Sequence, residues 1–538
     1  MTDPARIPAG VWRASLGFAA TLALALRLPT LALREIVEGD GVHYAWLARA
    51  LLAGDASGLA NPYWSNLWPG VIAAASAVTG LDPVAAGRWA SLAAGVLLAA
   101  GTGLLAERVF GRAAGIVAAL AVAVHPWLIH FSTLVYTESL FAVLLVAVLL
   151  AADSTMREPR PARAMLLGVA AGGALLTRPE AWAAILAAMG GLLACRRHRA
   201  AAIAAFILAA CVLGRAGLVH RHHGRWDFGI GSKGTVNLLL GLAATDPERE
   251  RLVREVDAEG GSRLEERSRQ TSLVRLLWSE PHLMGRHYAG NLSRAAAACA
   301  RVFPPLPAAP GYQRIGASAA LCLTLGAAGA VLGLRARRSR GPALLVLATL
   351  GLHLAGLAAL LVHDRLVVAL APLFVVLLAG GVARATAVRP RLQPGLLGAV
   401  AATLVLCGPV SLAAVMRAER PAYAAEPPVQ REAARWLASR VPPPVRIMSP
   451  TRATAYYLLD DADSEGDVDL PWGGLAEVLA VARGRGVDVI VASEWHLDAS
   501  AHPAAAELTA GISAAGIEHL ATLGRRPERI FVYRVREP

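Results

Sequence analysis

Ionisable side chains that interrupt or flank long apolar runs are the residues of this sequence best placed to do chemistry. A charge at the centre of a bilayer costs about 2.5–3.5 kcal/mol on insertion scales, so a charge kept near a membrane span usually has a role. Short polar motifs of this kind begin at Glu35, His125, Leu176 and His363.

The first motif runs from Glu35 through Glu38 to Asp40 and is followed by a helical pattern that contains Tyr44. A carboxylate held rigidly at the membrane surface suits a general base. Asp40 also stands where the N-cap of that helix is expected, and an aspartate is an ordinary N-cap residue. Both interpretations remain open at this point.

The second and third motifs lie at turns between apolar runs. Glu138 follows a proline-marked turn and is expected to open the next helix, where it either complements the helix dipole or lines a cavity. Arg178 and Glu180 lie at the tip of an apolar hairpin. They either pair with each other, or Arg178 binds a phosphate through bidentate hydrogen bonds.

The fourth motif places Asp364 and Arg365 together between two apolar runs. It predicts either an interfacial anchor or a second cation for a phosphate. The acidic segment Asp461–Asp469 imitates the start of an EF-hand loop, but Trp472 stands where the loop needs its bidentate glutamate. We therefore interpret the segment as a solvated loop. The sequence offers no convincing set of metal ligands, and dependence on a divalent metal is left open.

The composition shows what must position these motifs. Of 538 residues, 56% are hydrophobic and 17% charged, against about 45–50% and 25% in an average soluble domain. This excludes a disordered chain, a fibrous chain and an ordinary cytosolic enzyme. The net charge of +13 comes mostly from arginine clusters between apolar runs, so membrane topology explains it better than nucleic-acid binding does.

Placing every arginine cluster in the cytoplasm gives one consistent threading of about eleven spans. The N-terminus is then cytoplasmic, and the short apolar stretch 67–80 is a juxtamembrane or re-entrant helix that does not cross. The expected spans cover about 11–33, 84–106, 112–130, 134–152, 164–177, 180–195, 200–219, 314–334, 342–362, 366–383 and 395–416.

The expected fold is an α-helical polytopic membrane protein with a small C-terminal α/β soluble domain. The transmembrane domain covers residues 1–416 and includes outer loops at 34–83 and 220–313. Residues 417–538 form the extracytoplasmic domain. Its pattern predicts an amphipathic helix at 429–440 and buried strands at 445–448, 487–492 and 530–535.

Taken in order, the motifs resemble those of the GT-C polytopic glycosyltransferases, in the branch of the protein O-mannosyltransferases and the lipid A aminoarabinose transferase. The resemblance extends over about residues 11–385. It is carried by Asp40 with Tyr44, the segment Ala48–Gly54, the segment Glu138–Phe141 after Pro126, the complete motif Leu176–Glu180, and Arg365 before Pro372.

The resemblance implies a transferase that uses a polyprenyl-phosphate-linked sugar, with Asp40 as the base toward the acceptor hydroxyl. Arg178 and Arg365, and more weakly Lys233, would bind the donor phosphate. Glu38, Tyr44, Glu138, Glu180 and Asp364 would shape the cavity. Many relatives carry a second carboxylate after the aspartate, where this chain has Gly41, so Glu38 or Glu35 would have to replace it.

The acceptor is left open between a glycan, a lipid and a protein. Alanine bias and the single lysine suggest a GC-rich bacterial genome. Together with the predicted spans, we expect a protein of the bacterial inner membrane that contacts its lipids. An amphipathic-lipid transporter or flippase is one alternative function, although no internal repeat supports it. A non-catalytic envelope protein on the same scaffold is another.

Overall fold

The computed structural model describes most of the chain between residues 7 and 536. Lys233, Glu38 and most of the acidic segment Asp461–Asp469 lie outside the described residues. The residues not described are 1–6, 33, 35–36, 38, 61–63, 225, 229–236, 239–240, 243–277, 280, 306–316, 338, 389–391, 419–428, 443, 451–452, 459–466, 472–473, 495–496, 498–502, 526–528 and 537–538.

The chain divides into two compact units, which we call the helical unit and the mixed unit. The helical unit comprises residues 1–33, 59–230 and 285–423. The mixed unit comprises residues 34–58, 231–284 and 424–538, so that it combines the segment around Asp40 with the C-terminal region.

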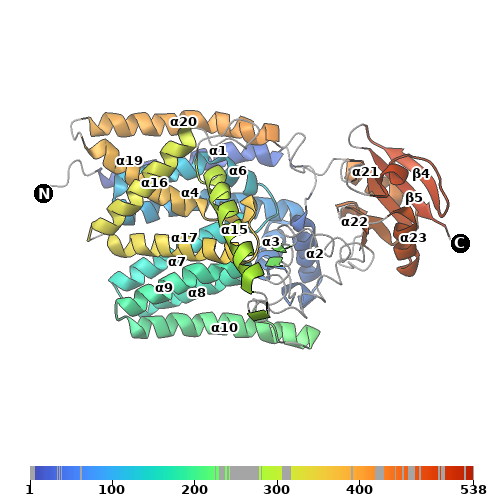
Figure 1. The fold of residues 1–538 in the computed structure, drawn as a ribbon, viewed down its shortest axis with the longest axis horizontal. Coiled ribbons are helices and arrows are strands. Elements are labelled where there is room, and N and C mark those ends of the chain that lie inside the picture. The colour runs from blue at the N-terminus through green and yellow to red at the C-terminus, as the bar shows by residue number, and fades with distance from the viewer. Residues whose placement is uncertain are drawn as a thin grey trace. The chain divides into compact units, whose positions relative to one another are not determined.

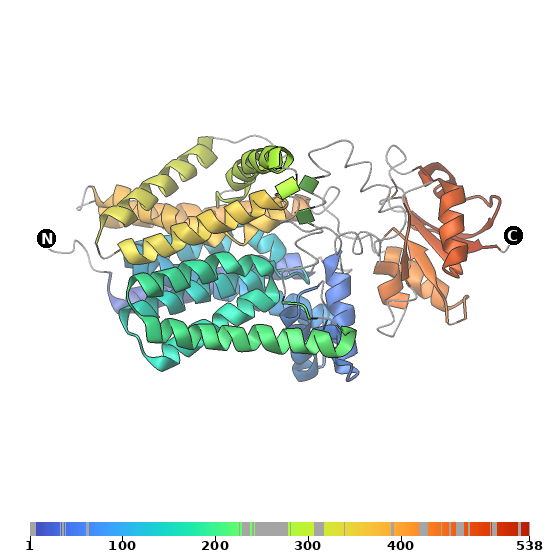
Figure 2. The same cartoon turned by 60° about the horizontal axis from the view of Figure 1, so that its bottom comes forward.

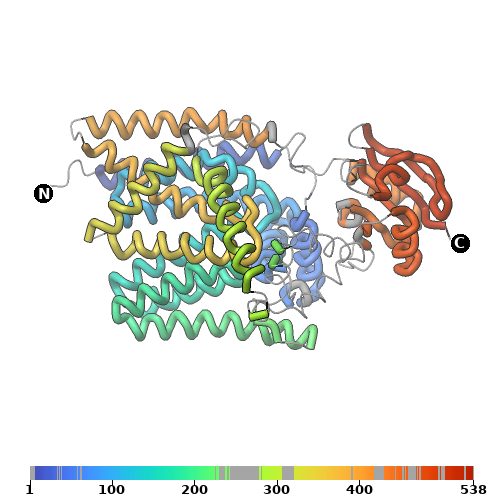
Figure 3. The backbone as a smooth tube through the Cα atoms, in the orientation of Figure 1, coloured from blue at the N-terminus to red at the C-terminus, as the bar shows by residue number. Residues whose placement is uncertain are grey.

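The helical unit is built from apolar helices that pack along their lengths, as Figures 1 and 2 show. Their order along the chain can be followed in Figure 3. The helices are α1 (Ala9–Ala32), α3 (Leu67–Thr79), α4 (Pro83–Phe110), α5 (Arg112–Val124), α6 (Pro126–Phe131), α7 (Glu138–Arg157), α8 (Pro161–Thr177), α9 (Trp182–Ala194), α10 (His198–His223), α15 (Pro281–Val302), α16 (Ala317–Arg335), α17 (Arg340–Ala359), α18 (Asp364–Val368), α19 (Ala371–Ala387) and α20 (Gln393–Ala418).

The expected fold class is confirmed. In the described chain six helices, α1, α4, α7, α10, α17 and α20, are long and apolar enough to cross a membrane. Shorter apolar helices occupy the other five expected spans. Two expectations are wrong in detail. The span predicted at 112–130 is broken at His125, because Pro126 begins the separate helix α6. The span predicted at 366–383 is broken at Ala369 and Leu370, between α18 and α19.

Small residues let some of these helices approach closely. A Cβ atom at Gly381 of α19 would lie 2.1 Å from the backbone oxygen of Leu325 in α16, and one at Gly329 would lie 1.9 Å from the backbone oxygen of Leu377. Helix pairs within membranes pack through such small residues because no hydrophobic force drives apolar helices together there. The α16–α19 crossing therefore depends on both glycines.

The mixed unit contains helix α2 (Asp40–Leu52) and the C-terminal α/β fold. A five-stranded sheet has the order β2-β1-β3-β5-β4, in which β1 pairs in parallel with β2 and β3, and β5 pairs antiparallel with β3 and β4. Its elements are α21 (Val429–Ala438), β1 (Ile447–Ser449), α22 (Ala453–Leu458), β2 (Asp467–Asp469), α23 (Leu475–Gly484), β3 (Val489–Ser493), α24 (Ala505–Leu508), β4 (Ile517–Leu523) and β5 (Ile530–Val535).

Alternate residues of the strands face two hydrophobic cores, as the period of two requires. Val489 and Val491 of β3 pack with α21, whereas Ile490 packs on the opposite face with α23. The expected small α/β domain and its three predicted strands are confirmed. The short β2 and the half-buried β4 were not predicted.

Candidate functional site

Glu138 is the centre of a buried ion-pair cluster in the helical unit. It is the first residue of α7, as the sequence predicted, and is 1% exposed. Its Oε1 accepts a hydrogen bond of 3.0 Å from Nη1 of Arg178 and a second one from Nε of Arg365. One carboxylate oxygen therefore joins two guanidinium groups, one from the turn after α8 and one from the short helix α18. We call Tyr136, Glu138, Arg178, Glu180 and Arg365 the Glu138 cluster.

Arg178 is held from both sides by carboxylates. It donates to Glu180 at 3.0 Å from Nη2 and at 3.4 Å from Nε, in addition to its contact with Glu138. Burial lowers the pKa of the Arg178 guanidinium, but the charges of Glu180 and Glu138 outweigh that effect and raise its pKa above the ordinary value. Arg178 therefore stays a fixed positive charge. The expected pairing of Arg178 with Glu180 is present, and Glu138 joins it.

Arg365 reaches the same carboxylate from the other side. Its guanidinium carbon lies 4.2 Å from the centre of the Tyr136 ring, a cation–π contact, and its side chain is 24% exposed. The neighbouring Asp364 is not paired with Arg365 but with Arg301 of α15, at 2.6 Å and 3.0 Å. Arg301 was not singled out from the sequence, because it stands 63 residues away from Asp364 in the chain.

One carboxylate oxygen of the cluster accepts no hydrogen bond within the part of the chain described. The Oε2 atom of Glu138 is buried and has no hydrogen-bond partner there. The cluster and the neighbouring pair Asp364–Arg301 together hold three arginines and three carboxylates, which balance in formal charge. Guanidinium groups in such an arrangement can exchange a carboxylate for a phosphate, since both anions accept the same bidentate hydrogen bonds.

A buried arginine fixes the loop that leads to Glu138. Arg27 of α1 is fully buried and donates from Nε to Oγ of Ser132 at 2.7 Å. It also donates to the backbone oxygens of Ala23 and Ala123, and no carboxylate of the described chain pairs with it. We did not single Arg27 out from the sequence, yet an arginine inside the first apolar run was a usable signal.

Two further contacts hold the same loop against α4. Oγ of Ser91 donates to the backbone oxygen of Leu134 at 2.6 Å. A Cβ atom at Gly95 would lie 2.6 Å from Cβ of Ser132, so a side chain there would displace the loop. Residues 132–135 are buried, and Tyr136, Thr137 and Glu138 follow directly at the cluster. The packing of α1 and α4 thus determines where Glu138 stands.

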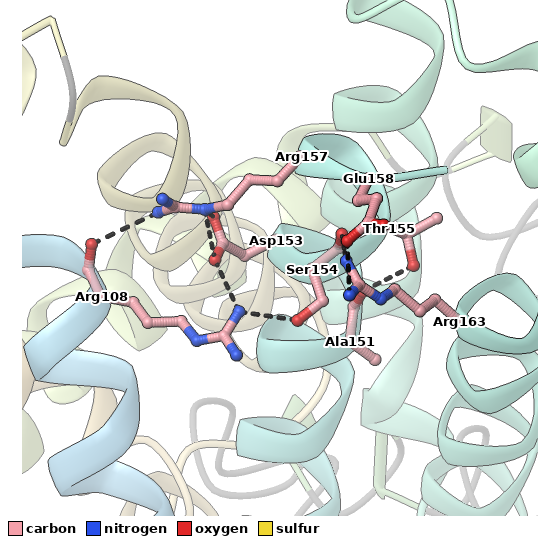
Figure 4. A network of polar contacts seen from close by, with 8 residues as sticks. All are labelled: Arg108, Ala151, Asp153, Ser154, Thr155, Arg157, Glu158 and Arg163. Atoms are coloured by element: carbon pink, nitrogen blue, oxygen red, sulfur yellow. Dashed lines mark hydrogen bonds and ion pairs between the residues drawn. The ribbon is translucent and has the colours of Figure 1, made fainter. Parts of the chain in front are cut away.

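The opposite end of α7 carries a second polar network, shown in Figure 4. Asp153 is buried and accepts hydrogen bonds from Arg108 at 3.1 Å and from Arg157 at 3.0 Å, and Arg163 pairs with Glu158 at 2.6 Å. A helix of 20 residues is about 30 Å long, close to the thickness of the hydrocarbon core. The arginine-rich network and the Glu138 cluster therefore lie at opposite ends of a helix long enough to cross that core.

Asp40 and Tyr44 belong to the mixed unit. Asp40 is the first residue of α2, and Gly39, with a φ of 45°, is the N-cap. The N-cap alternative for Asp40 is thus wrong by one residue. Tyr44 is buried, at 1% exposed. The structure brings together Glu138, Glu180, Arg178 and Arg365 of the predicted site residues, with Asp364 turned to Arg301.

Part of the chain matches the sequence model of a known protein family. The family described as dolichyl-phosphate-mannose-protein mannosyltransferase matches residues 68–216. That segment contains Glu138, Arg178 and Glu180. A search of curated protein sequences finds no significant match.

Solved structures resemble the chain over most of its length. The structure of ArnT from Cupriavidus metallidurans bound to undecaprenyl phosphate has a TM-score of 0.61 and 15% identity, covering 98% of each chain. The oligosaccharyltransferase of Archaeoglobus fulgidus with zinc and sulfate has a TM-score of 0.59 and 14% identity, covering 89% of this chain and 68% of the other. The expected likeness to the GT-C membrane glycosyltransferases is confirmed at the level of the fold.

Proposed function

We propose that the chain is an integral membrane glycosyltransferase that moves a sugar from a polyprenyl-phosphate donor to an acceptor hydroxyl on the extracytoplasmic face. The observation that carries this proposal is the Glu138 cluster. Two arginines that are distant in the chain, Arg178 after α8 and Arg365 in α18, converge there on one buried carboxylate at the end of an apolar helix. A purely stabilising role does not explain such a cluster, because buried ion pairs contribute little to protein stability.

The comparisons support a lipid phosphate as the group that the arginines bind. The similar ArnT structure holds undecaprenyl phosphate. The oligosaccharyltransferase AglB of Archaeoglobus fulgidus, with a TM-score of 0.55, 13% identity and coverage of 90% of this chain and 69% of the other, was solved with a dolichol-phosphate and an inhibitory peptide. We therefore assign Arg178 and Arg365 to the donor phosphate, with Lys233 as a further candidate in the second outer loop.

In the proposed reaction the acceptor oxygen attacks the anomeric carbon while the bond to the phosphate oxygen breaks. Asp40 takes the proton of the acceptor hydroxyl as general base. The polyprenyl phosphate leaves with additional negative charge, which Arg178 and Arg365 stabilise where it develops. Glu138 and Glu180 hold these two guanidinium groups in place, and Glu38, Tyr44 and Asp364 remain candidates for the walls of the cavity.

The arginines also support an orientation. The network of Arg108, Arg157 and Arg163 lies at the face opposite to Glu138, and arginine-rich ends favour the cytoplasm. We place the Glu138 face outside, the N-terminus in the cytoplasm and the C-terminal domain in the extracytoplasmic space of a bacterial inner membrane. The acceptor is a glycan, a lipid or a protein.

The test compares purified wild-type protein with Asp40→Asn in detergent. Undecaprenyl phosphate should raise the melting temperature of both proteins. Release of polyprenyl phosphate from a panel of polyprenyl-phosphate sugars, with a membrane extract as acceptor source, should occur only with the wild type, with a loss of about 10²–10⁴-fold in the variant.

The matched control is Asp82→Asn. Asp82 is the N-cap of α4 and accepts from the backbone nitrogens of Val84 and Ala85, and asparagine caps a helix equally well. Its release rate should equal that of the wild type. If undecaprenyl phosphate does not bind the wild-type protein, the proposed donor class is wrong. If donor is consumed at the same rate by Asp40→Asn, Asp40 is not the base.

A further inference from the structure

Helix α2 and the C-terminal fold belong to the same compact unit although about 370 residues separate them in the chain. The contacts between them are concentrated on α22. We call Val37, Trp46, Arg49, Tyr456 and Tyr457 the α2 clasp.

Arg49 makes the central contact of the α2 clasp. Its guanidinium carbon lies 3.8 Å from the centre of the Tyr456 ring, and its Nη1 donates to the backbone oxygen of Tyr456 at 3.1 Å. Trp46, one turn earlier on α2, places its ring 5.9 Å from the same tyrosine ring. Tyr456 is 1% exposed, so these contacts are made in a dry environment, where cation–π interactions are strongest.

A second contact fixes the chain before α2. The backbone nitrogen of Val37 donates to the hydroxyl of Tyr457 at 2.9 Å. Asp40 therefore stands between two anchored points, Val37 on one side and Trp46 with Arg49 on the other. Both anchors end on consecutive residues of α22.

Helix α22 is itself fixed to the C-terminal domain. The hydroxyl of Thr454 donates to the side-chain oxygen of Gln430 in α21, and both residues are buried. The Arg431 guanidinium of α21 also lies 4.6 Å from the centre of the Tyr457 ring. Since α21 packs on the sheet through Val429 and Leu437, the α2 clasp ends on the domain core.

Isolated helices shorter than about 12–15 residues are marginal in water, and α2 has 13 residues. Its position must therefore come from tertiary contacts. From this we infer that the C-terminal domain positions α2 for the reaction, with Arg49 and Tyr456 as positioning residues for Asp40. This inference rests on the proposed role of Asp40. It gives the C-terminal domain a part in turnover, while the proposed site for the donor phosphate is the Glu138 cluster of the helical unit.

The test measures three quantities on the full chain: kcat for sugar transfer, the melting-temperature shift caused by undecaprenyl phosphate, and hydrogen exchange of the amides of residues 40–52. Arg49→Ala and Tyr456→Ala should lower kcat by about ten- to hundredfold, because a displacement of about 1 Å suffices for such a loss. The undecaprenyl-phosphate shift should not change, and exchange in residues 40–52 should become faster.

Two variants separate positioning from general damage. Tyr456→Phe retains the ring face and the backbone oxygen that Arg49 uses, so it should retain turnover and slow exchange. Arg440→Ala removes a cation–π contact of the same kind within the C-terminal domain, 4.8 Å over Trp436, without touching α2. It should behave as the wild type in all three measurements.

The inference is overturned if Arg49→Ala keeps kcat within twofold of the wild type, or if exchange in residues 40–52 stays as slow as in the wild type. It is also overturned if Arg440→Ala lowers kcat as much as Arg49→Ala does. Should the wild type show no transfer at all, the proposed function fails, and the exchange measurement still decides whether the α2 clasp holds the helix.

Discussion

Replacing Glu138 by glutamine removes one negative charge from the cluster and leaves its shape. Glu138 is 1% exposed and its Oε1 accepts from Arg178 and Arg365. Loss of one partner of a buried ion pair costs about 3–5 kcal/mol, and Arg365 is open enough to reach water. Because Arg178 also keeps Glu180, we expect destabilisation at the low end, about 3 kcal/mol, with a lower melting temperature.

The same change should make a phosphate bind more tightly. A carboxylate and a phosphate on two sides of one guanidinium lie about 5–6 Å apart, where two unit charges repel by about 3 kcal/mol at an effective dielectric constant of about 20. Solvent at Arg365 screens part of this repulsion. The half of the repulsion that we expect to remain corresponds to about a tenfold change in Kd. We therefore expect Glu138→Gln to bind undecaprenyl phosphate at least about tenfold more tightly, and its melting temperature to rise more on binding.

The assay is equilibrium binding of undecaprenyl phosphate to the purified protein in detergent, together with thermal unfolding with and without the ligand. The control is Glu158→Gln at the other end of α7, because Glu158 also pairs with two arginines, Arg160 and Arg163. Its Kd should equal that of the wild type. Weaker binding by Glu138→Gln, similar to that of Arg178→Gln, would refute the idea that Glu138 and the phosphate share the same guanidinium groups.

Three further predictions concern the parts that position the cluster. Ser132→Ala leaves Nε of the buried Arg27 without its acceptor, so we expect a loss of about 1.5–3 kcal/mol of stability in thermal unfolding; an unchanged melting temperature would mean that the contact with Arg27 is dispensable. Gly381→Ala places a Cβ atom 2.1 Å from the backbone oxygen of Leu325, so we expect a loss of at least about 1–3 kcal/mol of stability. The control Gly351→Ala, whose Cβ would have nothing within 4 Å, should be neutral. Equal melting temperatures of the two variants would contradict the close approach of α16 and α19. Asp153→Asn weakens the contacts to Arg108 and Arg157 and should cost about 1–3 kcal/mol of stability. Binding of undecaprenyl phosphate should stay unchanged, because Glu138 lies about 22 Å away along α7. A changed Kd would place the two networks in one site.

Much of the membrane fold could be read from the sequence because the cost of burying polar groups in a bilayer is local. Each apolar run of sufficient length must satisfy its backbone internally, which makes it a helix wherever it stands. The runs of the helical unit were accordingly predicted in type and order, and Glu138 was placed at the start of its helix. The break at His125 was missed, since the apolar pattern continues through Pro126.

The motif Leu176–Glu180 was also readable, because Arg178 and Glu180 are near neighbours in the chain and must meet at one turn. Their contact needs no information on how helices pack. The same holds for the strands β1, β3 and β5, whose short runs of mostly apolar residues predict burial.

Only the tertiary structure decides which distant charges meet. Arg365 reaches Glu138 across 227 residues, Asp364 turns to Arg301, and Arg27 supports the loop before Glu138. These contacts depend on the angles and offsets at which helices pack, and those come from the fit of many side chains across interfaces. The contacts between α2 and helix α22 of the C-terminal domain also depend on how these helices pack. Local sequence determines which segments enter the membrane and which residues carry charge, whereas packing determines which charges share one site.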